Sequence, residues 1–423
     1  MKHSHSFAPT RRTFLKTVGG GAAAVAFGGL SMPALGQNKT LTIIFDGNNE
    51  SQVAALRESI TEFEAASGAT VTLNLMDHEA HKTAIRNYLV AGAPDVCFWF
   101  SGNRMKAFVE RGLFDDISDL VEEQNYAQAL GGTLSATAVD GKVYGLPLAG
   151  NLWGNFYLKN VFEEKGLVAP TTWEETLAYG EAAKSAGMAP LAFGSKELWP
   201  CGGFFDELNL RINGLENHIA LMDGHISYLD PMLQPVFDHW EELIKADFFL
   251  ENHSSYGWQE AGALLSQRKA GMMNLANFVK YAIPEADIPH LTFVPFPKIA
   301  DIPRFEDFST DSVHIPANAK NKELAREFLA VFYKPENLHA FLAPAGNVPP
   351  RNDMPPSDDP LVNAAVESLK SVAGTAQYYD RDTDPDMAQA GLNGFQEFMV
   401  HPDRREQILT RLDDTRKRIF GVS

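Results

Sequence analysis

The sequence predicts an α/β fold divided into two lobes or domains, on three observations. Short apolar strands alternate with amphipathic helices over residues 41–100, which is typical of a parallel sheet with helices on its faces. The 423 residues exceed what one hydrophobic core usually accommodates. No segment repeats with a period of roughly 20–50 residues, which excludes a solenoid.

The first hundred residues account for the parallel sheet. Its strands are expected at residues 41–45, 71–75 and 96–100. The helices between them end at Gly68 and Gly92, because glycine commonly closes a helix. Ligands bind beyond the carboxyl ends of the strands in such sheets. We therefore expect the loops 46–50 and 101–104 to share one edge of the sheet and to form a site.

Later segments continue the mixture of helices and strands. Residues 151–300 are richer in helix and aromatic residues, and Thr172 is placed to cap a helix with Glu175 completing a capping box. Residues 312–316 predict another strand, and residues 321–332 an amphipathic helix. The region from residue 349 onward is again loop and helix.

The first 36 residues are expected to be an export signal outside the fold. Residues 10–16 read TRRTFLK, a short apolar run follows at 18–30, and small residues surround Gly36. The twin arginine resembles the signal of the Tat exporter. A membrane anchor is the alternative, but the apolar run is shorter than the ~20 residues that cross a bilayer. We expect cleavage near Gly36 and a soluble periplasmic product.

The net charge excludes some partners. Removing residues 1–36 takes away four of the 36 basic residues and no acid, so 32 bases remain against 54 acids, a net charge of −22. Long-range repulsion then disfavours nucleic acids and anionic membranes as partners. The two cysteines, Cys97 and Cys201, are expected to be buried free thiols.

Motifs of catalysis and metal binding are missing from the sequence. It contains no Gly-x-Ser-x-Gly, Walker or Gly-x-Gly-x-x-Gly pattern. His78 and His81 are three residues apart, not the four that a helical zinc site needs, and we expect them on the surface. The acidic segment 380–386 lacks the glycine and glutamate of an EF-hand. We expect no catalytic residue, metal or cofactor, although a glycosidase with paired carboxylates stays as the alternative. A purely structural or adhesion protein is disfavoured because repeats are absent.

Five motifs occur in one order along the chain and resemble those of extracellular solute-binding proteins of carbohydrate ABC importers, the maltose-binding-protein-like family 1. They read APDV, GKVYGLP, PTTWEE, QRKAGMM and NKELAREFLAVF, and they lie at residues 93–96, 141–147, 170–175, 267–273 and 321–332. The fourth departs from the family's pattern, with Lys-Ala-Gly in place of Gly-x-Ala.

The resemblance implies a two-lobed periplasmic-binding-protein fold of type II, in which each lobe is a mostly parallel sheet flanked by helices. Crossover segments would form the hinge between the lobes. The N-terminal lobe would hold residues 38–149 and 308–346, and the C-terminal lobe 150–307 and 347–423. The protein would be a monomer that closes around a sugar-like solute and delivers it to a membrane permease with its ATPase.

A sugar offers hydroxyls at its edge and apolar C–H groups on its faces, so its site should combine polar side chains with aromatic rings. Candidates come from the predicted strand ends and from positions that match the family. They are Asn49, Glu50, Trp99, Asn103, Arg104, Asn151, Trp153, Trp199, Asn277, Asp311, Arg351, Tyr379, Asp380 and Arg381.

Structural roles stay open for several of these candidates. Asn49 fits a turn, and Trp99 and Trp153 fit core packing. Arg351 fits a bridge between loops, and residues 379–381 fit a solvated surface loop. The ligand's identity also stays open: a cluster of Arg104, Arg351 and Arg381 would admit an acidic or sulfonated sugar.

Overall fold

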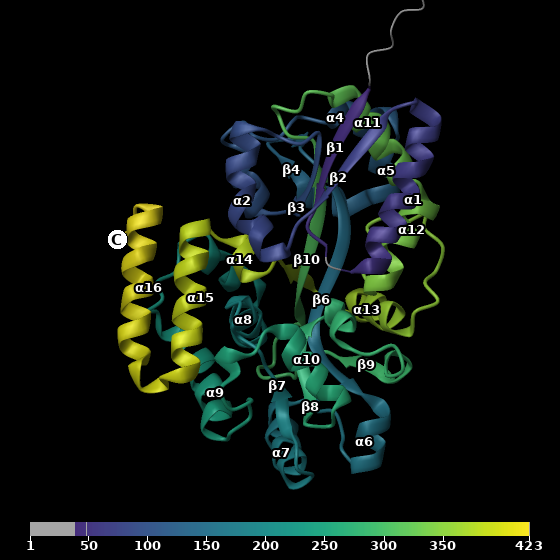
Figure 1. The fold of residues 1–423 in the computed structure, drawn as a ribbon. Coiled ribbons are helices and arrows are strands. Elements are labelled where there is room, and N and C mark those ends of the chain that lie inside the picture. Colours follow the sequence, from purple (N-terminus) through teal and green to yellow (C-terminus); the bar gives the residue numbers. More distant parts are fainter. Residues whose placement is uncertain (1–38, 48, 423) are drawn as a thin grey trace, which may run out of the picture. The chain divides into compact units, whose positions relative to one another are not determined.

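The computed structural model describes residues 39–47 and 49–422, and within them nine strands form one curled sheet (Figure 1). Its strand order is β2-β1-β3-β10-β6-β8-β7, with β11 beside β10 and β9 beside β6. A separate pair consists of β4 and β5. The strands are β1 Thr40–Phe45, β2 Thr70–Leu75, β3 Val96–Phe100, β4 Ala138–Val139, β5 Lys142–Val143, β6 Leu146–Leu158, β7 Ala189–Ala192, β8 Ala270–Ala276, β9 Leu291–Val294, β10 Phe305–His314 and β11 Gly374–Ala376.

The two ends of the sheet are parallel, and helices cover them. β1 pairs in parallel with β2 and β3, and β7 pairs in parallel with β8. The helices are α1 Glu50–Ser67, α2 His78–Ala91, α3 Asn103–Val109, α4 Ser118–Glu123, α5 Tyr126–Leu130, α6 Lys159–Lys165, α7 Trp173–Ser185, α8 Trp199–Met222, α9 Gln234–Lys245, α10 Trp258–Ser266, α11 Lys322–Phe332, α12 Pro335–Leu342, α13 Pro360–Lys370, α14 Tyr379–Asp382, α15 Pro385–Val400 and α16 Arg405–Phe420.

The centre of the sheet is antiparallel. It contains two long strands, β6 and β10, that pass from one end of the sheet to the other. In β6, residues 146–152 pair with β10 and residues 153–158 pair with β8 and β9. β10 pairs with both β3 and β6. Figure 1 shows β6 and β10 running from the part that holds β1 to β3 into the part that holds β7 and β8.

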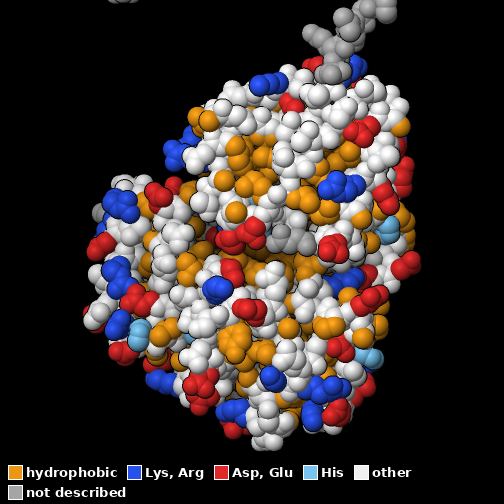
Figure 2. Space-filling view, viewed as in Figure 1, with side chains coloured by type: hydrophobic (Ala, Val, Ile, Leu, Met, Phe, Trp, Pro, Cys, Tyr) orange, Lys and Arg blue, Asp and Glu red, His pale blue; other side chains and the backbone are white. Residues whose placement is uncertain are grey.

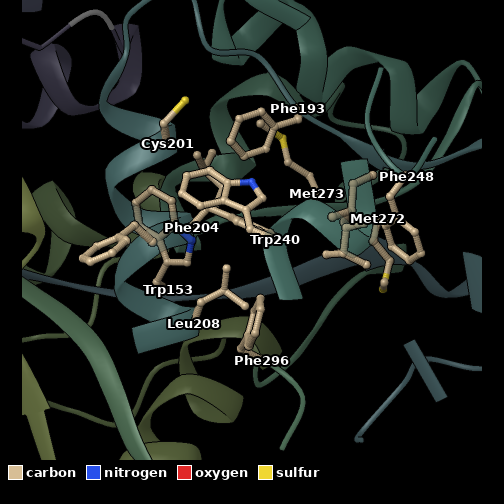
Figure 3. Close-up of a cluster of buried hydrophobic side chains, with 14 of the residues drawn as sticks. Trp153, Phe193, Cys201, Phe204, Leu208, Trp240, Phe248, Met272, Met273 and Phe296 are labelled. Carbon is tan, nitrogen blue, oxygen red and sulfur yellow. The ribbon is translucent and has the colours of Figure 1, made fainter. Parts of the chain in front are cut away.

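Two large hydrophobic clusters lie on either side of this crossing. One draws its buried residues from 41–149 and 313–342. The other draws its buried residues from 153–296 and 361–412 and is strongly aromatic (Figure 3). Its centre includes Phe204 and Trp240, whose ring centroids are 5.4 Å apart. Segments far apart in the sequence therefore share each core.

The local predictions are largely confirmed. The three early strands and the two helices between them lie where the sequence placed them, and Gly68 closes α1 with φ 68°. Thr172 and Glu175 form the predicted capping box of α7. Cys97 and Cys201 are buried and free, as expected. The strand expected at 312–316 is longer and begins earlier, at Phe305, because the residues before 312 also pair with β6.

One prediction was wrong. His81 is not on the surface but fully buried, because α2 packs its apolar face on β3. One ring nitrogen is 3.0 Å from the carbonyl oxygen of Phe98 and the other 2.8 Å from the Tyr88 hydroxyl. His78, one turn earlier, is half-exposed.

The predicted export signal, residues 1–36, lies outside the described residues. Among the helices of the described chain, none combines the length and the apolar composition that a membrane span requires.

Candidate ligand-binding site

A cavity of about 390 Å³ opens where the two hydrophobic clusters approach each other. Residues that follow β1 and the last residues of β3 line one side of it, and residues at the starts of α8 and α10 line the other. The loop 101–104, which was expected to share this edge, contributes no lining residue. Figure 2 shows a hollow across the middle of the view, edged by acidic and hydrophobic side chains. The cavity therefore has walls from distant parts of the chain, as a site between two halves requires.

One wall is aromatic. Trp199, Trp258 and Phe278 pack edge to face, with ring centroids 5.4–6.1 Å apart, a geometry that aromatic pairs prefer. Trp153 joins them, 6.0 Å from Trp199, and Gly203 allows this approach because a Cβ atom there would lie 2.3 Å from the Trp153 ring. The wall offers flat apolar surface to a ligand.

The opposite side carries charge. The carboxylate of Asp46, at the end of β1, is 2.8 Å from Nδ1 of His78 at the start of α2. Burial raises the pKa of Asp46, but the hydrogen bond and charge of His78 outweigh it, so that the pKa lies below its usual value. The carboxylate is therefore ionised and held by its partner at neutral pH.

A chain of side-chain amides crosses the floor of the cavity and ends on a carboxylate. Gln52 donates to Asn347 over 3.4 Å, and Asn347 donates to Asn151 over 2.7 Å. Asn151 in turn donates to Asp311 over 3.0 Å. Each of these amides donates toward Asp311, so the Asp311 carboxylate accepts the last hydrogen bond of the chain. The Asp311 side chain is 32% exposed, and its remaining lone pairs can accept hydrogen bonds from a ligand.

Arg381 completes this arrangement from α14. Its guanidinium donates to Asp311 over 2.8 Å and to the Ser309 hydroxyl over 2.7 Å. The guanidinium carbon also lies 4.0 Å from the ring centroid of Phe100 and 4.7 Å from that of Tyr378. Arg381 thus ties α14 to β3 and β10, and it fixes the orientation of Asp311.

The cavity brings together most of the predicted site residues. The predicted residues that line it are Asn49, Glu50, Trp99, Asn151, Trp153, Trp199, Asp311, Tyr379, Asp380 and Arg381. Some of them also have structural roles. Asn49 caps α1, Trp99 is 4% exposed and belongs to a hydrophobic cluster, and the Tyr379 hydroxyl bonds Tyr228 within the core.

Four predicted residues do not line the cavity, because their side chains contact other groups of the protein instead. Asn103 donates to the carbonyl of Asp382, and the Arg104 guanidinium lies over the Trp99 ring. Asn277 is buried, and its amide bridges the Leu152 N–H and the Gly346 carbonyl. Arg351 pairs with Asp353 and donates to the carbonyl of Tyr333, so it bridges loops.

Other lining residues were not predicted from the sequence. They include Gln52, His78, Lys82, Phe100, Trp258, Gln259, Tyr281, Asn347 and Tyr378, together with Phe278 beside the predicted Asn277. Asp46 also lines the cavity and lies in the loop 46–50 that was expected to contribute to the site. The sequence did contain a signal for Trp258, which is the first residue of α10. Glu260 is the third residue of this helix, where its carboxylate accepts a hydrogen bond from the N–H of Gly257, and a glutamate at that position is typical of a helix start. Gln52 and Asn347 meet across 295 residues of sequence, and no local pattern indicates that contact.

No group of three or more His, Cys, Asp or Glu side chains is arranged to hold a metal ion in the part of the chain that the structure describes.

Comparison with known proteins agrees with this geometry. The family model of the bacterial extracellular solute-binding protein matches residues 46–338. An uncharacterised ABC transporter extracellular-binding protein of Pyrococcus horikoshii is 23% identical over 69% of this chain and 66% of its own length, slightly under two thirds. A probable sugar-binding periplasmic protein of Rhizobium meliloti is 23% identical over 65% of this chain and 67% of its own.

Solved structures show the same fold. The bacterial solute receptor AcbH, described as having an exclusive preference for β-D-galactopyranose, superposes with a TM-score of 0.85 and 31% identity over 90% of this chain and 100% of its own. RafE in complex with raffinose superposes with a TM-score of 0.73, at 17% identity, over 90% of this chain and 99% of its own. The resemblance seen in the five sequence motifs is confirmed. This chain belongs to the family of bacterial extracellular solute-binding proteins and has its two-lobed α/β fold.

Proposed function

We propose that this protein is the periplasmic solute-binding component of an ABC importer and that its ligand is a small sugar. The observation that carries the proposal is the cavity itself, which sets an aromatic wall opposite oriented amides and carboxylates. A pyranose presents its C–H faces to such a wall and its hydroxyls to such polar groups. The names of the relatives, which refer to sugars and ABC transporters, support the same function.

The size of the cavity favours a small ligand. Its volume of about 390 Å³ lies near the lower end of the roughly 300–1,000 Å³ of typical ligand pockets. AcbH, 31% identical to this chain, is described as preferring β-D-galactopyranose. D-Galactose is therefore the first ligand to test.

Capture would occur by closure of two lobes, residues 38–149 with 308–346 and residues 150–307 with 347–423. The two hydrophobic clusters support this division. Three segments connect the halves: β6, β10 and the stretch around Val348, which bridges Gly150. Ligand favours the closed form because only that form makes the contacts of both halves.

The remaining parts of the proposal concern the cell. The protein would be exported with residues 1–36 as its signal, act as a monomer in the periplasm, and present the closed form to a membrane permease with its ATPase. A glycosidase is the alternative, because the cavity holds several carboxylates.

Isothermal titration calorimetry tests the proposal. The purified protein is titrated with D-galactose, D-glucose, lactose and raffinose, and the mixtures are then analysed for hydrolysis products. We expect saturable binding of at least one sugar, one molecule per chain, with every sugar recovered intact. Absence of heat with the whole panel contradicts the proposal, and release of monosaccharides from lactose or raffinose supports the enzyme instead.

A further inference from the structure

We propose that the cavity selects its ligand by charge, admitting neutral sugars and excluding sugar carboxylates such as uronic acids, and that Asp380 is the residue most responsible. This inference rests on the proposed function and adds the electrostatic class of the ligand. Its basis is which charged groups that line the cavity have an ion-pair partner and which have none.

The basic side chains that line the cavity already contact carboxylates. His78 pairs with Asp46 at 2.8 Å, and Lys82 with Glu79 at 3.3 Å. Arg381 pairs with Asp311 at 2.8 Å. A ligand carboxylate would therefore share each of these groups with an internal carboxylate that already balances its positive charge, so none of the three offers an uncompensated charge to an anionic ligand.

The arginine cluster that would admit an acidic sugar does not form. Arg351 is paired with Asp353 and does not line the cavity. Arg104 does not line it either, and its guanidinium lies 5.5 Å from the Trp99 ring centroid. Of the three arginines only Arg381 reaches the site, and it is already ion-paired.

Asp380 has the opposite character. Its side chain lines the cavity and is only 8% exposed, yet no hydrogen bond or ion pair joins its carboxylate to another described residue. Arg104 attracts it electrostatically without such a contact. A buried carboxylate without a hydrogen-bond donor is costly. A ligand hydroxyl would supply that donor.

The balance of charge then disfavours anions. Glu50 is a second lining carboxylate without a hydrogen bond or ion pair to any residue that the structure describes, so two carboxylates face the ligand without a contacting cation. A ligand anion would be repelled most strongly by Asp380, which is buried, and less by Glu50, which is exposed and screened by water. We expect a uronic acid to bind at least about 100-fold more weakly than the matching neutral sugar.

The test is calorimetry at about pH 6 and low ionic strength, where a sugar carboxylate is ionised and screening is weak. Wild type is titrated with D-galactose, D-galacturonate, D-glucose and D-glucuronate. We expect a neutral sugar to bind and its uronic acid to be rejected. In Asp380→Asn the neutral sugar should bind about 10-fold more weakly. The ratio of the two dissociation constants, that of the uronic acid over that of the neutral sugar, should also fall by about 10-fold or more.

Asp358→Asn is the matched control, because it removes the same charge from an exposed side chain outside the cavity. It should leave both affinities unchanged. Glu50→Gln gives a second, independent measure, since Glu50 is exposed at the start of α1 and its substitution should spare the fold.

A uronic acid that binds wild type as tightly as its neutral partner overturns the charge selection while leaving the proposed function intact. If the ratio of the two dissociation constants is the same as in wild type in both Asp380→Asn and Glu50→Gln, these two residues are not responsible for the charge selection. Flat titrations with all four sugars contradict the proposed function and this inference with it.

Discussion

At the scale of single residues, the polar groups of the cavity hold one another in fixed orientations before any ligand is bound. Asn151 receives a hydrogen bond from Asn347 and gives one to Asp311, so its rotation would break both. Arg381 fixes the other oxygen of Asp311. Binding to groups that are already ordered costs less conformational entropy, which increases affinity.

Asn347→Ala tests this arrangement. The substitution removes the donor to Asn151 and the acceptor for Gln52, so Asn151 and then Asp311 lose their fixed orientation. We expect the affinity for the sugar bound by wild type to fall about 10-fold in calorimetry. Asn352→Ala, an exposed residue of the same loop outside the cavity, should change nothing. Equal affinity of Asn347→Ala and wild type would show that the chain of amides does not position the site.

The sequence could predict those site residues that follow directly from strand ends. Glu50 follows β1 and Trp99 lies at the end of β3, and the edge where parallel strands end is known before the tertiary structure is. Asn347 and His78 could not be found in this way, because they reach the cavity only through packing between distant segments. Arg351 and Asn277 occupy plausible positions, but backbone groups of Tyr333 and of Leu152 in β6 bind their side chains.

At the scale of elements, the alternation of polar and apolar residues and the capping residues predicted the helices and strands that the sequence analysis placed. β6 is the main exception. Its thirteen residues are almost all buried, so it lacks the alternation that marks a half-exposed strand, and its change of partners at Trp153 depends on the whole sheet. The antiparallel centre of the fold was for this reason not predicted, and the resemblance implied only crossover segments between two mostly parallel sheets.

The capping box of α7 gives a prediction at this scale. The Thr172 hydroxyl accepts from the Glu175 N–H, and Thr172 lies outside the cavity. Thr172→Ala should lower the free energy of unfolding by about 1 kcal/mol in urea denaturation and leave sugar affinity unchanged. Glu174→Ala, in the same turn but without a capping hydrogen bond, serves as the control. A stability equal to wild type would mean that the tertiary contacts of α7 make the cap redundant.

At the scale of the whole molecule, buried acids collect where α8 packs against β10. Asp206, Glu207, Glu306 and Asp307 are fully buried there, and Arg211 contacts Glu207 and Glu306. Burial raises the pKa of Glu207 to about 8, against the opposing effect of Arg211. Burial also raises the pKa of Asp206 and Asp307.

Stability should therefore fall in mildly alkaline solution. A carboxyl whose pKa is raised on folding contributes its full stability below its unfolded pKa of about 4.3 and loses it as the pH rises through the folded value. The free energy of unfolding, measured in urea, should be lower at pH 9 than at pH 6, because Glu207 then ionises inside the protein. Glu207→Gln should flatten this dependence, whereas an equally steep decline in that variant would assign the effect to other groups.

The central claim is that a sugar closes two halves of the molecule around the cavity. Small-angle X-ray scattering of the purified protein, with and without a saturating concentration of the sugar that binds in calorimetry, tests it most directly. We predict a smaller radius of gyration with the sugar present. An unchanged radius of gyration at full saturation would contradict capture by closure.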